Sequence, residues 1–172
     1  MGHVHTLGHA LAHGAIFALV ARNAGEALRF SAETIAFADE HDMDLWRGYG
    51  SILNAYARVL AGDTASSIPV MENGFWHLAR TQTGTMVPVH HAVHAYALAK
   101  VGRFDEAARE AALVRDEIRS GTERYFWTEC LRWLGDYQRL LPRADLGDAE
   151  ASYEEALECA RRQRALTWEL CA

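Results

Sequence analysis

Histidines at helical spacing are the first residues of this chain that could do chemistry. Four of the nine are His3, His5, His9 and His13, and the last three stand four residues apart. A helix over this segment would carry those three side chains on one face. A pair of histidines at this spacing supplies two of the three or four ligands that a zinc ion needs. The segment is therefore either a metal site or an ordinary helix surface.

A second histidine cluster, His90, His91 and His94, lies in a later apolar segment. Helical periodicity places His91 and His94 on the packing side, beside Ala95 and Leu98, where a neutral imidazole with one hydrogen-bond partner fits. The two clusters belong to different parts of the chain, and neither contains a His-Glu-x-x-His motif. We interpret both as structural and predict no metal site. The alternative interpretation is that the histidine clusters make the chain a small-molecule or metal-responsive sensor.

Two further groups of polar residues could carry chemistry. The segment from Asp39 to Asp44 is rich in oxygen ligands. It lacks the glycine turn and the twelfth-position glutamate of an EF-hand, so we expect a solvated turn. Ser66 and Ser67 have no convincing histidine and aspartate partners for a hydrolase triad, and the sequence has no phosphate loop. We expect no catalytic residue and no cofactor in this chain, which is therefore not an enzyme by itself.

Five tryptophans could form an aromatic groove: Trp46, Trp76, Trp127, Trp133 and Trp168. Tryptophan at helical spacing usually belongs to the core because burying its large ring removes much apolar surface from water. We therefore expect these rings in the core.

Charge and composition narrow the function classes. The net charge of −6 over 172 residues argues against nucleic acid as a partner, since phosphate binding requires a basic face. No apolar stretch approaches the roughly 20 residues of a membrane span. Cys130, Cys159 and Cys171 form no Cys-x-x-Cys pair, which favours reduced thiols in the cytoplasm.

Helical patterning runs from end to end, and strand signals are nearly absent. One apolar stripe is predicted in the segment 101–118, through Phe104, Ala107, Ala108, Ala111, Ala112, Arg115 and Ile118. Small-residue turns interrupt the pattern at residues 23–25, 61–63, 101–103 and 146–148. Gly62 and Gly102 lie 40 residues apart, and a period of this length with two helices per unit is typical of an α-solenoid.

We predict four helical pairs: 5–22 with 25–41, 44–61 with 64–81, 86–101 with 104–120, and 123–141 with 147–164. Further breaks are expected at residues 41–43, 82–85 and 120–122. Trp168-Glu169-Leu170 resembles the opening of a fifth pair. We therefore expect one all-α domain over 1–172 that is a fragment of a longer multidomain protein.

The third and fourth pairs resemble tetratricopeptide (TPR) repeats. Leu98, Gly102, Phe104 and Ala107 follow that family's order of an apolar residue, a glycine, an aromatic residue and an alanine. Leu134-Gly135 and then Ala149, Tyr153, Ala156 and Leu157 repeat the theme in the fourth pair. The units exceed the usual length of about 34 residues, so the resemblance is to the wider TPR-like group, and it implies a right-handed α-solenoid of about four repeats.

A narrower resemblance covers most of the chain. Glu129, Arg132 and Gly135, followed by Ala160-Arg161-Arg162-Gln163, are similar to the C-terminal helical region of large bacterial signalling proteins. Those proteins join a class III adenylate or guanylate cyclase domain, or a transcription-regulator domain, to an AAA-type ATPase and a TPR-like tail. The opening from Gly2 to Leu7 is similar to an opening of the same tails. The resemblance implies a sensor or assembly tail and transfers no catalytic residue.

The expected function is a non-catalytic scaffold that binds a protein, a peptide or other domains of its parent. The repeat register predicts that the concave face is lined by Tyr49, Ile52, Tyr56, Val89, Ala92, Tyr96 and Lys100. The two ends of a solenoid expose apolar residues, here Leu7, Leu11 and Phe17 at one end and Leu157, Leu166, Trp168 and Leu170 at the other. We therefore expect a homodimer or end-to-end association.

Overall fold

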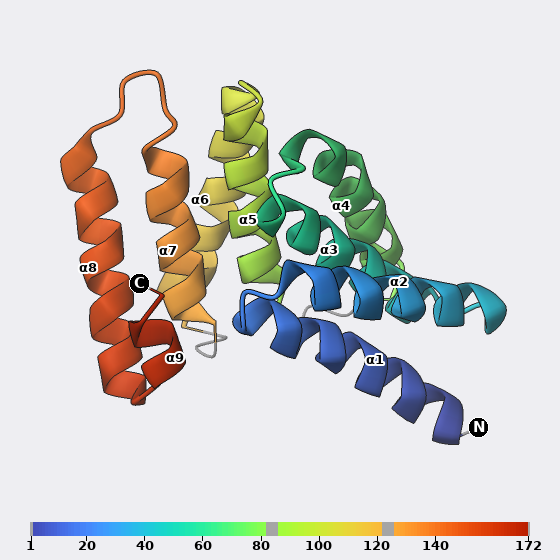
Figure 1. Cartoon of the computed structure of the whole chain (residues 1–172). Coiled ribbons are helices and arrows are strands. Elements are labelled where there is room, and N and C mark those ends of the chain that lie inside the picture. The colour runs from blue at the N-terminus through green and yellow to red at the C-terminus, as the bar shows by residue number, and fades with distance from the viewer. Residues whose placement is uncertain (1, 82–85, 122–125, 172) are drawn as a thin grey trace. The chain divides into compact units, whose positions relative to one another are not determined.

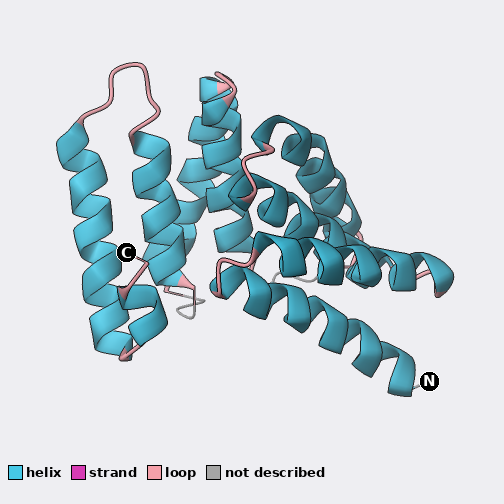
Figure 2. Ribbon diagram, in the orientation of Figure 1, coloured by secondary structure: helices cyan, strands magenta, loops and turns pink. Residues whose placement is uncertain are grey.

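A computed structural model describes residues 2–81, 86–121 and 126–171, and these residues form helices and loops without a strand (Figure 2). The all-α prediction is confirmed. The chain divides into two compact units, Met1–Thr85 and Met86–Ala172, which we call unit 1 and unit 2. The expectation of a single domain over 1–172 stays a prediction.

Unit 1 consists of helices that pack in chain order (Figure 1). They are α1 (Gly2–Val20), α2 (Ala24–Glu40), α3 (Asp44–Leu60) and α4 (Thr64–Ala79). Helix α3 lies against α2 and α4 and also touches α1, so most of its residues are buried. The start of α3 lies beside the end of α4, because the two helices run in opposite directions.

Unit 2 follows the same pattern of neighbouring helices. They are α5 (Val87–Lys100), α6 (Phe104–Ser120), α7 (Trp127–Gln138), α8 (Leu146–Gln163) and α9 (Leu166–Glu169). Helix α5 packs against α6 and α7, α7 packs against α8, and α9 folds back on α8. The helix bounds that the structure describes confirm the predictions to within about three residues. The expected start of the seventh helix at 123, and the breaks at 82–85 and 122, lie outside the described residues.

Five of the described helices end in one recurrent turn. A residue with left-handed backbone geometry follows each helix: Arg22, Asp42, Gly62, Gly102 and Arg164. The next residue donates its N–H to a carbonyl five positions earlier, as from Asp63 to Arg58 and from Arg103 to Leu98, both at 2.9 Å. This pattern is the Schellman motif, which satisfies carbonyls that the helix end leaves open. The turns expected at Gly62 and Gly102 are confirmed, whereas Gly25 and Gly147 lie inside the first turns of α2 and α8.

Helices α3 and α4 approach each other through glycines. A Cβ placed on Gly74 would lie 2.9 Å from the Gly48 carbonyl oxygen and 3.0 Å from the Ile52 nitrogen. The two backbones are therefore in direct contact, which only residues without a side chain permit. This contact fixes α4 against α3 and so positions the side chains at the facing helix ends.

The apolar stripe predicted for the segment 101–118 is only partly confirmed in α6. Ala107, Ala111 and Val114 are buried, whereas Ala108, Ala112 and Arg115 are exposed. The half-buried Phe104 and Ile118 lie on the same line as the buried residues, so these positions of the stripe are confirmed. The prediction took in too wide an arc, because positions 108, 112 and 115 fall outside the narrow line that faces a neighbouring helix.

Candidate functional site

Most of the residues predicted to line a concave face are buried. The five buried ones are Tyr49, Ile52, Tyr56, Val89 and Ala92. Tyr96 is half-buried and Lys100 is exposed, both on α5. The accessible part of the predicted face is thus Tyr96 and Lys100, and binding through them stays a prediction.

A buried polar cluster in α7 lies next to this accessible part. We call it the Glu129 cluster, and it comprises Glu129, Arg132, Trp133, Asp136 and Tyr153. The Glu129 carboxylate accepts hydrogen bonds from Arg132 Nη2 at 2.8 Å, Arg132 Nε at 3.0 Å and Trp133 Nε1 at 2.9 Å. The side chains of Glu129 and Arg132 are only 2% and 11% exposed. Such a buried pair is tolerated because each charge is hydrogen-bonded to the other and to further polar groups.

The cluster continues from α7 into α8. Arg132 Nη1 donates to Asp136 Oδ2 at 2.6 Å, and the Tyr153 hydroxyl donates to Asp136 Oδ1 at 2.7 Å. Burial raises the pKa of Tyr153, and the hydrogen bond to Asp136 raises it further. Gly135 makes this approach possible, because a Cβ there would lie 2.5 Å from Tyr153 Cε1. The Glu-x2-Arg-x2-Gly pattern of the sequence is thus a packing device that joins α7 to α8.

The Glu129 cluster also fixes an aromatic pair between α5 and α7. The rings of Tyr96 and Trp133 lie with their centroids 4.9 Å apart, and the Arg132 guanidinium lies 4.2 Å from the Trp133 ring. Trp133 is held by its hydrogen bond to Glu129, so it gives Tyr96 a rigid support. This arrangement is suited to binding, since rigid aromatic side chains and arginine are enriched at protein interfaces.

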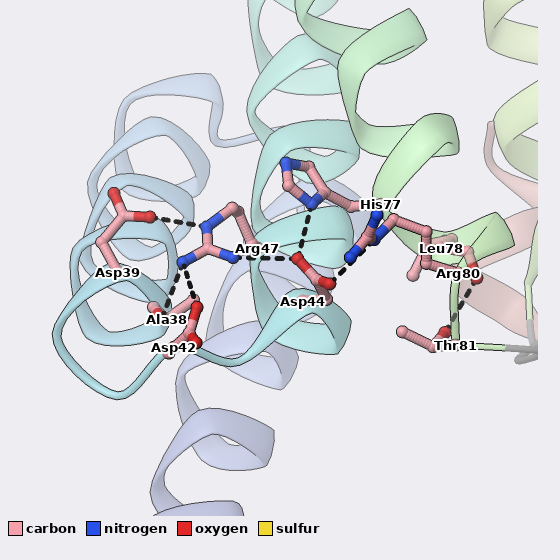
Figure 3. A network of polar contacts seen from close by, with 9 residues as sticks. All are labelled: Ala38, Asp39, Asp42, Asp44, Arg47, His77, Leu78, Arg80 and Thr81. Atoms are coloured by element: carbon pink, nitrogen blue, oxygen red, sulfur yellow. Dashed lines mark hydrogen bonds and ion pairs between the residues drawn. The ribbon is translucent and has the colours of Figure 1, made fainter.

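Unit 1 carries a second polar cluster, which joins helix ends (Figure 3). We call it the Asp44 cluster: Asp39, Asp42, Asp44, Arg47, His77 and Arg80. The carboxylate of Asp44, at the start of α3, contacts His77 Nδ1 at 2.8 Å and accepts hydrogen bonds from Arg47 Nη1 at 2.9 Å and Arg80 Nε at 3.0 Å. The hydrogen bonds from His77 and Arg80 lower the pKa of Asp44.

Arg47 completes the Asp44 cluster towards α2. Its Nε donates to Asp39 at 2.7 Å, and its Nη2 reaches the Ala38 carbonyl at 3.4 Å. An aspartate that orients a histidine is also found in catalytic sites, but here two arginines already share the Asp44 carboxylate. The cluster therefore acts as a brace that fastens α2 and α4 to the start of α3.

Sequence reasoning missed the Asp44 cluster. The expected solvated acidic turn is confined to residues 41–43 and holds for the exposed Asp42. Asp39 instead lies in α2 and binds Arg47, and Asp44 begins α3 and binds His77 of α4. The sequence did contain a signal for this cluster. Asp44 opens one predicted helix, and His77 and Arg80 lie at the end of the next. Consecutive helices are antiparallel, so these opposite charges come close together, and each charge also complements the dipole of its own helix end. The expectation of tryptophans in the core is wrong for Trp76, which is 57% exposed and lies beside the Arg80 guanidinium at 4.8 Å.

The histidine clusters are held by protein contacts. His91 Nδ1 hydrogen-bonds to Glu110 Oε2, and His94 Nδ1 lies 3.5 Å from the same oxygen. Burial raises the pKa of Glu110, but these histidines outweigh it and lower the value to about 2. Burial lowers the pKa of His90 to about 3.

The N-terminal histidines also contact one another. The His9 and His13 rings are stacked with centroids 4.0 Å apart, and His13 Nδ1 lies 2.9 Å from the His9 carbonyl oxygen. Over the residues that the structure describes, no group of three or more His, Cys, Asp or Glu side chains could hold a metal ion. In the same residues no helix is both long and apolar enough to cross a membrane.

The fold and its two clusters define an all-helical protein of neighbouring helix pairs, in which polar side chains fasten one helix to the next. Comparison with protein-family models gives no match, and comparisons with curated proteins and with solved structures give none either.

Proposed function

We propose that this chain is a non-catalytic interaction scaffold, a right-handed TPR-like α-solenoid of about four helix-turn-helix repeats. Two features support the solenoid: within each unit the described helices pack on their neighbours in the chain, and the same turn recurs at five helix ends. Stacked helical pairs of this kind present extended faces to protein segments. The resemblance noted above suggests a sensor or assembly tail of a bacterial signalling protein in the cytoplasm.

The accessible face of α5 carries this proposal. Tyr96 rests on Trp133 at a centroid distance of 4.9 Å, and the exposed Lys100 follows one helical turn later. A partly exposed tyrosine on a rigid support loses little conformational freedom on binding, which favours affinity. The cation of Lys100 would complement an acidic residue of the bound segment. We therefore propose a peptide or domain surface that offers an apolar group next to a carboxylate.

A selection experiment tests the proposal and supplies its own probe peptide. Peptides are selected from a random display library against the wild-type chain, and the binding of the best one is measured by calorimetry. We expect Tyr96→Ala to weaken binding by about tenfold or more and Lys100→Glu to weaken peptides that contain an acidic residue. Leu113→Ala, at an exposed position on α6, is the matched control. Peptides that bind both α5 variants as tightly as the wild type would contradict the proposed face.

A further inference from the structure

Helix α1 differs from every other described helix because it contains no Asp, Glu, Lys or Arg over its 19 residues. Each of the remaining helices carries at least one such charge. Its polar side chains are Thr6 and four histidines, and its other residues are Gly, Ala, Val, Leu, Ile and Phe. His3, His5, Thr6 and His9 are exposed. A largely apolar helix without charged residues is usually covered on more than one side.

The structure covers only one side of α1. Gly8 faces the Trp46 ring of α3 and Gly14 faces the Phe30 ring of α2, because a Cβ on either glycine would lie within 2.7 Å of those rings. The opposite side remains open, and Phe17 is 69% and Leu7 50% exposed there. Ala10 lies between them and is exposed as well. We call Leu7, Ala10 and Phe17 the α1 face.

The α1 face is suited to a second copy of this chain. A chain with a net charge of −6 repels its own copy, and this repulsion is weakest where the approaching surfaces carry no charge. An isologous contact also requires a patch that is complementary to itself. In an antiparallel pair of α1 helices, Leu7 of each copy would lie opposite Phe17 of the other. Ala10 of each copy would then lie opposite Gly14 of the other, and these two small residues would allow a close approach.

The other exposed apolar patch is less suited to self-association. Leu166 and Leu170 at α9 are 73% and 90% exposed, but Arg161 and Arg162 lie close by in ion pairs with Glu169 and Glu158. A two-fold contact there would have to bury or displace these charged groups, which opposes association.

We propose that the α1 face is a homodimer contact in which two copies pair through antiparallel α1 helices. A helix of 19 residues is about 28 Å long, so one helix face buries less than the roughly 800 Å² per partner of a standard stable interface. The dimer is consequently weak, with a dissociation constant on the order of 10–100 μM, and it forms as the protein concentration rises.

Sedimentation equilibrium over a range of concentrations tests the contact. We expect the wild type to dimerise and Phe17→Glu to weaken dimerisation at least tenfold. Ala10→Glu is a second variant in case the first unfolds, and circular dichroism checks the helix content of both. Leu166→Glu, the matched control on α9, leaves the dimer unchanged. A wild-type monomer at about 1 mM, or a dimer that Leu166→Glu disrupts and Phe17→Glu does not, would overturn the proposal.

Salt and cross-linking identify the occupant of the face. Higher salt screens the repulsion between two chains of charge −6, so the dimer persists or tightens, whereas loss of the dimer in salt would contradict an uncharged contact. Ala10→Cys in a Cys171→Ser background is joined between copies by a short bis-maleimide cross-linker, because the two positions lie only about four residues apart along the paired helices. A chain that stays monomeric and binds phosphatidylcholine vesicles through Phe17 would instead identify a lipid surface and refute the dimer.

Discussion

The two polar clusters use the same residue types at different depths. The Asp44 cluster joins helix ends near the surface of unit 1, where Arg80 is 57% exposed. The Glu129 cluster lies inside unit 2, where its central carboxylate is 2% exposed. Water screens and replaces the contacts of the first cluster but not those of the second. Hydrogen bonds of similar length therefore contribute very different amounts to the free energy of unfolding in the two clusters. The buried Glu129 cluster contributes more to the stability of the fold than the Asp44 cluster does.

The sharpest test of this difference is removal of the central carboxylate. Glu129→Ala leaves Arg132 buried without its main partner, and we expect a loss of about 3–5 kcal/mol in the free energy of unfolding. Asp44→Ala leaves its partners able to reach water and gives a much smaller loss. Urea titration followed by circular dichroism measures both. Equal losses of unfolding free energy for the two variants would contradict the difference between the buried and the exposed cluster.

The closest helix approaches of the two units also differ. Gly74→Ala brings a methyl group against the backbone of α3 in unit 1, which cannot yield without separating the helices. We expect a loss of about 3 kcal/mol. Gly135→Ala in unit 2 meets the Tyr153 ring, a side chain that can shift, so the loss is about 1–2 kcal/mol. Gly25→Ala, where the nearest atom is 3.7 Å away, is the control without a clash. A reversed order of the two losses in thermal unfolding would refute this account.

Acid should destabilise unit 2 before unit 1. The pKa of His90 is lowered from 6.5 to about 3, so the unfolded chain binds this proton first and stability falls as the pH drops below 6.5. The pKa of Glu110 is lowered from 4.5 to about 2, and its contribution is lost between these two values. In unit 1 the contribution of Asp44 persists until the pH falls below its ordinary value of 3.8.

Unfolding titrations between pH 7 and pH 3 measure this sequence of losses. His90→Leu should remove the pH dependence between about pH 6.5 and 4.5, and Glu110→Gln should reduce the pH dependence below about pH 4.5, where the contribution of His90 is also still being lost. Asp44→Asn serves as the unit 1 control and should leave the upper range unchanged. Wild-type stability that is constant from pH 6.5 to pH 4.5 would contradict a neutral, buried His90.

The smallest expected change in the free energy of unfolding comes from removing the indole N–H of one tryptophan in each unit. Trp133→Phe removes the indole N–H that binds Glu129 at 2.9 Å and costs about 1 kcal/mol or slightly more. Trp76→Phe, at a ring that is 57% exposed, stays within about 0.5 kcal/mol of the wild type. Differential scanning calorimetry of the pair gives the comparison. A larger decrease in melting temperature for the Trp76 variant would show that exposure does not predict the contribution of these two rings to stability.

The sequence predicts well where the helices lie in the chain, but it predicts poorly which of their side chains are buried against other helices. Periodicity and the glycines at positions 62 and 102 place most helix ends within a few residues. The break expected at 41–43 covers the left-handed residue Asp42, whereas the left-handed turns at Arg22 and Arg164 have no comparable signal, because arginine does not require that geometry.

Burial is the harder quantity to predict. The repeat register puts Tyr49 and Tyr56 on an open face, but α3 touches three other helices of its unit, and periodicity within one helix does not reveal how many neighbours it has. The Glu129 pattern is visible in the sequence, yet the burial of the Glu129–Arg132 pair depends on the helices packed against α7, which periodicity within α7 does not reveal.

The claim that an interaction face of unit 2 is built on the Tyr96–Trp133 pair can be tested by one NMR titration. The indole N–H signals of Trp133 and Trp76 report on unit 2 and unit 1 in the same spectrum. On addition of a display-selected peptide, the account predicts that the Trp133 signal shifts in saturable fashion while the Trp76 signal stays in place. A saturable shift of Trp76 with an unchanged Trp133 signal would contradict it.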